Sequence, residues 1–181
     1  MGNFDGGSPP VRVFVTGGTF DKEYDEIHGA LFFKGTHLPD MLRLGRSRLD
    51  VEVETLMMVD SLDMDDADRE RIAAAVADCP ERHVVVTHGT DTMVDTAGVI
   101  ARAAPGKTVV LTGAMIPWAF GSSDGLFNLG SALSFAQVLP PGAWIAMNGR
   151  FFAWNRVRKS LDRGVFEEVD VFEDVDGGAG G

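Results

Sequence analysis

The sequence contains little cysteine, an excess of acidic over basic residues and no long hydrophobic run. Cys79 is the only cysteine, which excludes an internal disulfide and a metal site built from cysteines. The chain has 16 Lys and Arg against 27 Asp and Glu, for a formal net charge of −11. That charge argues against non-specific binding to nucleic acid or to an anionic membrane. No apolar run approaches the roughly 20 residues needed to cross a bilayer.

The first residues also lack the features of a signal peptide. Met1-Gly2-Asn3-Phe4-Asp5 has neither the basic nor the apolar region of such a segment. The composition, 45% apolar and 24% charged, is ordinary for a globular protein. We therefore expect a cytoplasmic enzyme or binding protein, with no nucleic-acid partner and no membrane partner.

The regular structure that the sequence predicts alternates strands with helices. Helical patterns are expected for a short helix capped by Thr36, for residues 66–78 and 93–103, and for a helix that begins near Gly125. This order predicts an α/β fold, a three-layer Rossmann-like domain with a mainly parallel sheet. The apolar strands are predicted at 11–16, 51–57, 84–87, 108–112 and 143–147.

We expect a single domain over residues 11–170. Residues 1–10 are rich in glycine and proline, and residues 171–181 are acidic and rich in glycine. Both segments are therefore predicted to be flexible tails.

The central motif is His88-Gly89-Thr90-Asp91-Thr92, which lies between a predicted strand and a predicted helix. In open α/β folds, ligands bind at the carboxyl ends of the strands, where such a turn lies. The turn offers two hydroxyls and a carboxylate beside the free amides of a helix N-terminus. Taken alone, the same residues are equally consistent with an ordinary helix cap.

Other strand ends carry similar signals. Thr16-Gly17-Gly18-Thr19 opens a tight turn, but it lacks the third glycine of a dinucleotide-binding loop. The segment 21–35 that follows is predicted to be a loose hairpin, either a lid or a simple connection. Ser61 is either a site residue or the cap of the helix at 66–78, and Ser123 or Asp124 is expected to cap the helix after Gly125.

These polar turns share one position in the predicted fold. Thr19, Ser61, Thr90-Asp91 and Ala114 all come just after strands. If the strands are parallel neighbours, their carboxyl ends form one edge and the turns meet there. Capping explains each turn separately, but it explains poorly why two hydroxyls lie in turns opened by glycine.

Together the motifs resemble the bacterial-type asparaginase/glutaminase family, and they occur in that family's order over residues 11–170. The resemblance identifies the domain as one of the asparaginase N-terminal type. The matching motifs are Thr16-Gly17-Gly18-Thr19, Asp60-Ser61-Leu62-Asp63-Met64, His88-Gly89-Thr90-Asp91-Thr92-Met93, Thr112-Gly113-Ala114-Met115-Ile116-Pro117 and Ser123-Asp124-Gly125-Leu126-Phe127-Asn128.

The resemblance implies a role for each matched residue. Thr19 would be the nucleophile. Thr90 and Asp91, with Lys159 after the Met147-Asn148 strand end, would complete the catalytic group. Ser61 would hold the α-carboxylate of the substrate, and Asp91 its α-ammonium. The residues implied in substrate binding are Gly18, Ser61, Leu62, Gly89, Thr90, Asp91 and Ala114.

The implied reaction is hydrolysis of L-asparagine to L-aspartate and ammonia through a threonine acyl-enzyme, with minor activity on glutamine. Lys159 could act as a base when uncharged, or polarise Thr90 or a water when charged. Turn amides and helix starts could stabilise the oxyanion. The family needs no cofactor and no metal, and it forms homodimers or homotetramers.

The chain departs from the family in its length. Most members are about twice as long and carry a second domain that lends an acidic residue to the neighbouring site. We therefore expect a short, single-domain form with a higher KM. Tyr24 is the candidate lid tyrosine, although the sequence around it matches poorly. Two alternatives stay open: a non-catalytic domain that binds or senses a small amino acid, and an amidase for a larger amide.

Overall fold

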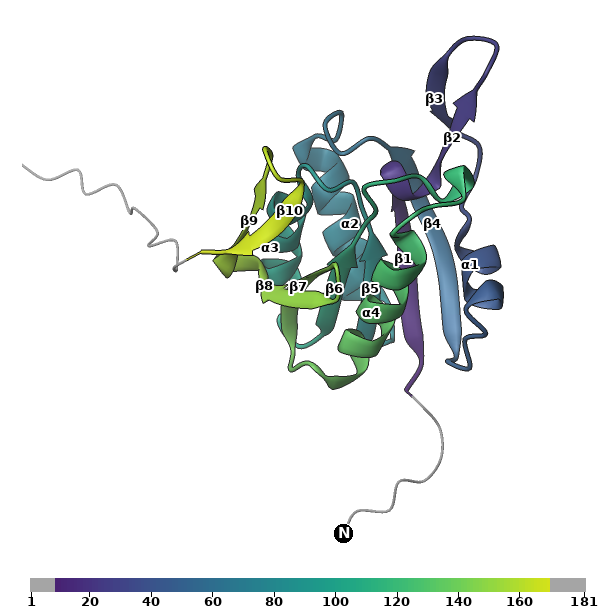
Figure 1. Cartoon of the computed structure of the whole chain (residues 1–181). Coiled ribbons are helices and arrows are strands. Elements are labelled where there is room, and N and C mark those ends of the chain that lie inside the picture. Colours follow the sequence, from purple (N-terminus) through teal and green to yellow (C-terminus); the bar gives the residue numbers. More distant parts are fainter. Residues whose placement is uncertain (1–8, 170–181) are drawn as a thin grey trace, which may run out of the picture.

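The structure, a computed structural model, describes residues 9–169 (Figure 1). The tails predicted at 1–10 and 171–181 lie outside the described residues, apart from Pro9 and Pro10.

A six-stranded sheet forms the centre of the fold, in the order β4-β1-β5-β6-β7-β8. The first five strands in this order are parallel and β8 runs antiparallel to β7. The predicted mainly parallel sheet, with all five predicted strands, is therefore confirmed. The strands are β1 (Val11–Gly17), β4 (Val51–Val59), β5 (His83–Thr87), β6 (Thr108–Thr112), β7 (Gly142–Met147) and β8 (Arg150–Ala153).

Helices cover both faces of this sheet. Buried side chains of α1 (Leu38–Leu44) and α4 (Gly125–Val138) pack on one face. Those of α2 (Asp66–Asp78) and α3 (Met93–Ala103) pack on the other. The result is the three-layer arrangement that the sequence predicts, because a parallel sheet must bury both of its faces.

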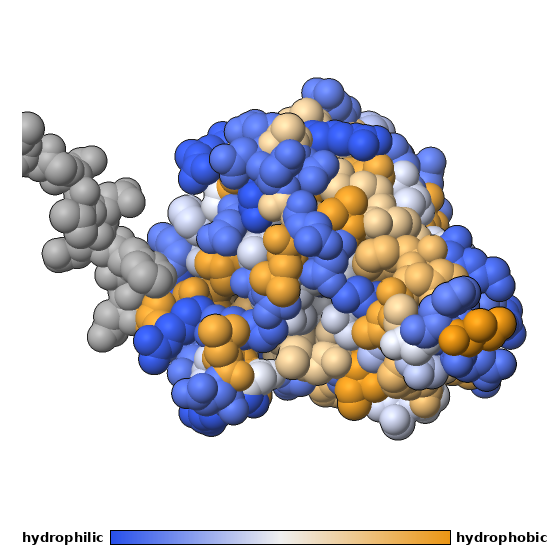
Figure 2. All heavy atoms as spheres, turned by 90° about the horizontal axis from the view of Figure 1, so that it is seen from above, coloured by the Kyte–Doolittle hydropathy of each residue, from blue (hydrophilic) through white to orange (hydrophobic). Residues whose placement is uncertain are grey.

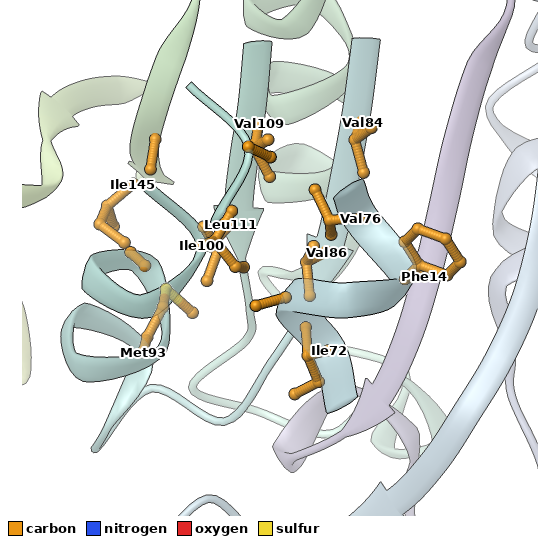
Figure 3. Packing of buried hydrophobic residues seen from close by; sticks show 14 of the residues in the cluster. Phe14, Ile72, Val76, Val84, Val86, Met93, Ile100, Val109, Leu111 and Ile145 are labelled. Carbon is orange, nitrogen blue, oxygen red and sulfur yellow. The ribbon is translucent and has the colours of Figure 1, made fainter. Parts of the chain in front are cut away.

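The pleat of the strands divides the core between the two faces. Val84 and Val86 of β5 point to the α2–α3 side, whereas Val85 between them points to the α1–α4 side. Figure 3 shows the first cluster, in which Ile72 and Ile100 reach toward the sheet. Each such fully buried aliphatic side chain contributes roughly 1.5–3 kcal/mol to stability.

Two smaller hairpins accompany the sheet. β2 (Lys22–Asp25) and β3 (Ala30–Phe33) form an antiparallel hairpin, which confirms the predicted hairpin and projects from the body at the end where β1 terminates (Figure 1). β9 (Val157–Ser160) and β10 (Val165–Glu168) form the second. Sequence analysis gave no strand for β8, β9 or β10. Three short 3-10 helices complete the fold, η1 (Thr19–Asp21), η2 (Trp118–Phe120) and η3 (Trp154–Arg156).

The helix caps differ in part from the expected ones. Asp65, not Ser61, caps α2, and Asp65 and Asp68 bond to each other's backbone amides in a capping box. The interpretation of Ser61 as that cap is therefore wrong. His37 holds the cap position of α1, while Thr36 Oγ1 accepts from Leu38 N at 3.2 Å.

Asp124 holds the cap position of α4, as expected, but its side chain makes no capping bond there. Among the described helices, none is long and apolar enough to cross a membrane.

The capping box gives a direct test of these assignments. Asp65→Ala should lower the free energy of unfolding by about 1 kcal/mol, because it leaves an amide in the first turn of α2 without its acceptor. Ser61→Ala should cause a smaller loss, because the buried Ser61 hydroxyl makes no hydrogen bond that the substitution would remove. Urea unfolding followed by circular dichroism measures both. Equal losses in the two variants would contradict the assignment of Asp65 as the cap.

Candidate active site

Glycine contacts bring the turns after β1, β4 and β5 together. Gly17 and Gly18 have φ of 101° and 77°, a region that L side chains rarely adopt. A Cβ on Gly18 would stand 2.6 Å from Gly89 Cα, and one on Gly17 would stand 2.6 Å from Val59 N. Since real Cβ atoms do not approach so closely, only glycine lets these turns touch. Thr19 follows directly, at the start of η1.

Ser61 faces the same contact from the turn after β4. A Cβ on Gly89 would stand 2.5 Å from Ser61 Cβ. Ser61 is buried, and among the described residues its Oγ has no hydrogen-bond partner. Thr92 Oγ1 donates to Ser61 O at 2.8 Å and ties this turn to the start of α3. The hydroxyl of Ser61 thus lies where the turns meet and its hydrogen-bond donor is unused, which is unusual for a buried polar group.

Lys159 reaches the β5 turn from β9. Its Nζ donates to Thr90 Oγ1 and to Asp91 Oδ1, both at 2.7 Å. The lysine side chain is 11% exposed, whereas that of Asp91 is 35% exposed, so the ion pair lies at the mouth of the site. The structure therefore brings together three of the four residues that the resemblance placed in one catalytic group, Thr90, Asp91 and Lys159. Thr90 itself is buried.

The buried His88 side chain stabilises the turn after β5 through two hydrogen bonds. Its Nδ1 lies 2.7 Å from Gly89 O, and its Nε2 lies 2.8 Å from Thr96 Oγ1. Since a carbonyl only accepts, Nδ1 carries the proton and Nε2 accepts from the Thr96 hydroxyl. Burial lowers the pKa of His88 to about 4, and the positive charge of Arg69 contributes in the same direction. The imidazole is therefore neutral at pH 7 and fixes the Gly89 carbonyl.

The end of β6 is held by the start of α4. Asp124 Oδ1 accepts from Met115 N and Ile116 N, both at 3.0 Å. The buried Asn128 donates to Gly113 O and accepts from Asn148 N, both at 2.9 Å. Together these bonds fix the Ala114 turn beside the end of β7.

The β2–β3 hairpin is anchored to the site at its base. Buried Asp21 accepts from His37 N at 2.8 Å, and its burial raises its pKa. Lys22 forms an ion pair with Asp60, the residue before Ser61. Burial alone would raise the pKa of Asp60, but the Lys22 bond and the Leu62 amide leave it lowered. Tyr24, the candidate lid residue, lies beyond this base and is 56% exposed.

The predicted site residues therefore fall into two groups. Leu62 is 72% exposed beside Ser61, and Tyr24 lies out on the hairpin. The rest gather at the carboxyl edge of the sheet, namely Gly18, Thr19, Ser61, Gly89, Thr90, Asp91, Ala114 and Lys159.

Sequence analysis missed the supporting roles of His88, Asp124 and Asn128. The signals were present, since all three residues lie inside the motifs that carry the resemblance.

Figure 2 views the molecule from this end, and hydrophobic side chains gather there on the side where Figure 1 places the hairpin. Leu31 and Phe32 of the hairpin are 48% and 40% exposed. Within residues 9–169, no group of three or more His, Cys, Asp or Glu side chains is placed to hold a metal ion.

Comparison with known proteins gives consistent relatives. A family model described as "Asparaginase, N-terminal" matches residues 10–175. The L-asparaginase of Thermococcus kodakarensis is 30% identical over 170 residues, which are 88% of this chain and 51% of that protein.

Two solved structures are similar throughout the fold. L-asparaginase I from Vibrio cholerae matches with a TM-score of 0.78 and 28% identity, over 88% of this chain and 51% of that one. A probable cytoplasmic L-asparaginase from Campylobacter jejuni matches with a TM-score of 0.76 and 28% identity, over 88% and 53%. The chain spans about half the length of these relatives.

The glycine contact predicts a position that tolerates no side chain. Gly18→Ala should cost on the order of 3 kcal/mol, because it combines a strained φ with a collision against backbone atoms that cannot move aside. Gly35→Ala is the matched control, since nothing lies within 4 Å of a Cβ added there. Urea unfolding of the two variants gives the comparison. A Gly18→Ala protein as stable as Gly35→Ala would contradict the close approach of the turns.

Buried His88 predicts a pH dependence of stability. The folded pKa of about 4 lies below the ordinary value of 6.5, so the unfolded state takes up the extra proton between these values. Stability from this source is complete above about pH 6.5 and is lost as the pH falls toward 4. Between about pH 7 and pH 5 the loss should be about 2 kcal/mol. His88→Asn should flatten the slope measured by urea unfolding, and an unchanged slope would contradict a buried neutral imidazole.

Proposed function

Because the chain belongs to the asparaginase family, we propose that it is an amidohydrolase that converts L-asparagine to L-aspartate and ammonia. The observation that carries this proposal is the contact of Lys159 Nζ with Thr90 Oγ1 and Asp91 Oδ1. The same turn also contains Gly89, which meets both Gly18, the residue before Thr19, and Ser61. A residue that only caps a helix would need neither a contact with Lys159 nor the close approach of Gly18, Gly89 and Ser61.

In the proposed reaction, Thr19 Oγ attacks the side-chain amide carbon of the substrate. The hydroxyl proton passes to the departing nitrogen, which leaves as ammonia, and an ester links the aspartyl group to Thr19. Water then adds to the ester carbon and returns a proton to Thr19, which releases aspartate. Turn amides at the carboxyl edge of the sheet are suitable donors to the oxyanion of both steps.

The structure favours one of the two roles considered for Lys159. Its Nζ lies 2.7 Å from both Thr90 Oγ1 and Asp91 Oδ1, so it contacts a carboxylate as well as the hydroxyl that it would polarise. We therefore assign it the task of polarising Thr90, and through it a nearby water, rather than that of a base. Ser61 supports binding of the α-carboxylate, because its buried hydroxyl has no acceptor among the described residues.

Several further features stay predictions. Activity on glutamine is expected to be minor, since one methylene changes discrimination by about 1–3 kcal/mol. A cytoplasmic location, a lid role for Tyr24, and the Gly18, Leu62, Gly89 and Ala114 contacts to substrate belong to the same proposal.

Ammonia release by the purified full chain tests the proposal. L-Asparagine should give ammonia and aspartate, and L-glutamine should give less. Thr19→Ala and Thr90→Val should each lower kcat by roughly 10²–10⁴-fold, because each removes a hydroxyl that acts in the reaction. Thr19→Ser and Thr90→Ser, which keep the hydroxyls, should retain part of the activity.

Lys159→Met should lower kcat to a similar degree, and Arg158→Met on the exposed side of β9 serves as its control. Full activity of Thr19→Ala would contradict the nucleophile assignment. Binding of asparagine measured by calorimetry, without any ammonia, would support the non-catalytic amino-acid-binding alternative instead. Turnover of a larger amide alone would support the remaining one.

A further inference from the structure

The turn that carries Ser61 is acidic, which is unexpected for a site that takes a carboxylate. Ser61 lies in the sequence between Asp60 and the exposed Asp63, and the whole chain has a net charge of −11. Like charges near a protein surface repel each other strongly at short range. A substrate carboxylate that approaches Ser61 therefore needs a positive charge close by.

Lys22 supplies a positive charge at this turn. Its Nζ forms an ion pair with Asp60 Oδ2, and within residues 9–169 this is the only ion pair that involves residues 60–63. The side chains are 17% exposed for Lys22 and 27% exposed for Asp60, so salt screens this pair less than it screens a fully exposed one. Lys22 is therefore the residue that offsets the acidity of the turn.

Asp60 shapes the turn and also stays charged. Its Oδ1 accepts from Leu62 N at 3.0 Å, and its carbonyl accepts from Asp63 N at 2.9 Å. The side-chain bond forms an Asx turn around Ser61. Burial favours the neutral form of Asp60, but the Lys22 bond and the Leu62 amide keep its pKa below the ordinary value. The carboxylate that shapes the turn is thus a negative charge next to Ser61 at neutral pH.

Lys22 is held at this place from two sides. It lies in β2, in the hairpin that projects from the end of the molecule where β1 terminates (Figure 1). Its backbone pairs with Phe33 of β3, and its Nζ lies 5.9 Å from the centre of the Phe33 ring, a distance compatible with a cation–π contact. The ammonium group therefore lies between an aromatic ring and the Asp60 carboxylate, and its charge stays beside the Ser61 turn.

We infer that Lys22 determines the affinity of the site for the α-carboxylate of the substrate, because it cancels the charge of Asp60 beside Ser61. The inference rests on the proposed function, since it assumes a substrate whose carboxylate binds at Ser61. Lys22 acts through Asp60 and is a positioning residue, so its loss should change KM and leave kcat nearly unchanged. A lysine that only anchors the hairpin would act through the bond to Asp60 and not through its charge.

The first test removes the charge of the lysine. Lys22→Met leaves Asp60 unpaired, and the KM for L-asparagine should rise about tenfold or more, with kcat within about threefold of wild type. Lys22→Arg keeps the positive charge and should keep KM within about threefold of wild type. Lys34→Met is the matched control, because Lys34 is the exposed lysine that directly follows β3 in the same hairpin. It should leave KM unchanged, and circular dichroism confirms that each variant is folded.

A second substitution separates charge from anchoring. In Lys22→Met/Asp60→Asn the ion pair is still absent, but asparagine keeps an oxygen for the Leu62 amide and the local charge is again balanced. The KM should return to within about threefold of wild type. A KM that stays as high as in Lys22→Met would overturn the inference, because the bond and not the charge would then matter. An unchanged KM in Lys22→Met would overturn it as well.

Binding of L-aspartate separates this inference from the proposed function. This ligand has the same α-carboxylate and needs no turnover, so calorimetry with the full chain gives its Kd in the same variants. If wild type releases no ammonia, but the Kd rises in Lys22→Met and recovers in the double variant, the proposed reaction is wrong and the role of Lys22 is supported. Ammonia release with equal KM in all variants would show the reverse. A chain that neither releases ammonia nor binds L-aspartate would overturn both.

Discussion

The candidate site depends on the approach of backbones that only glycine permits. Gly18 touches Gly89, Gly89 faces Ser61, and a Cβ on Gly113 would stand 2.5 Å from His88 O. The chain of contacts runs across the turns after β1, β4, β5 and β6, which are neighbours in the sheet. Any larger residue would separate these turns by about the width of a methyl group. The turns that carry Thr19 and Thr90 would then no longer meet.

Buried hydrogen bonds hold the same turns on the side that faces the protein core. His88 links the Gly89 carbonyl to Thr96 on α3, and Asn128 links the ends of β6 and β7. His88 bonds to a carbonyl and a hydroxyl, and Asn128 bonds to two main-chain groups and to the Asp124 carboxylate. In the low dielectric of the protein interior such bonds are strong when made and costly when lost. The turns are therefore rigid without contributing a charge of their own.

The sequence was most informative where local and tertiary preferences agree. The helices at 66–78 and 93–103 were predicted close to their observed bounds, because their apolar residues recur at helical spacing and pack against the sheet. β5 and β6 were predicted from their β-branched runs, which are largely buried, and β4 from the alternation of apolar with acidic residues. The cap of α2 was ambiguous because Ser61 and Asp65 are both good capping residues, and only the reciprocal bond with Asp68 distinguishes them.

The missing strands and Lys159 illustrate what local patterns do not contain. β8, β9 and β10 are four residues each, and they are strands because of their pairing, not because of their composition. Lys159 lies 69 residues from Thr90, so nothing nearby in the sequence indicates their contact. The position of Lys159 followed from the resemblance, and the structure brings it to Thr90. Leu62 and Tyr24 remain exposed, and their proposed roles depend on a bound substrate.

The Asp91–Lys159 ion pair joins the two tasks that the proposed mechanism assigns to this turn. Asp91 is to hold the substrate ammonium, yet its Oδ1 is already bonded to Lys159. One carboxylate can serve both cations, since its second oxygen remains for the ammonium. The carboxylate that recognises the substrate then also keeps the lysine directed at Thr90. Because Asp91 is more exposed than Lys159, the substrate can reach the carboxylate without displacing the lysine. Recognition and polarisation are thereby coupled through a single side chain at the mouth of the site.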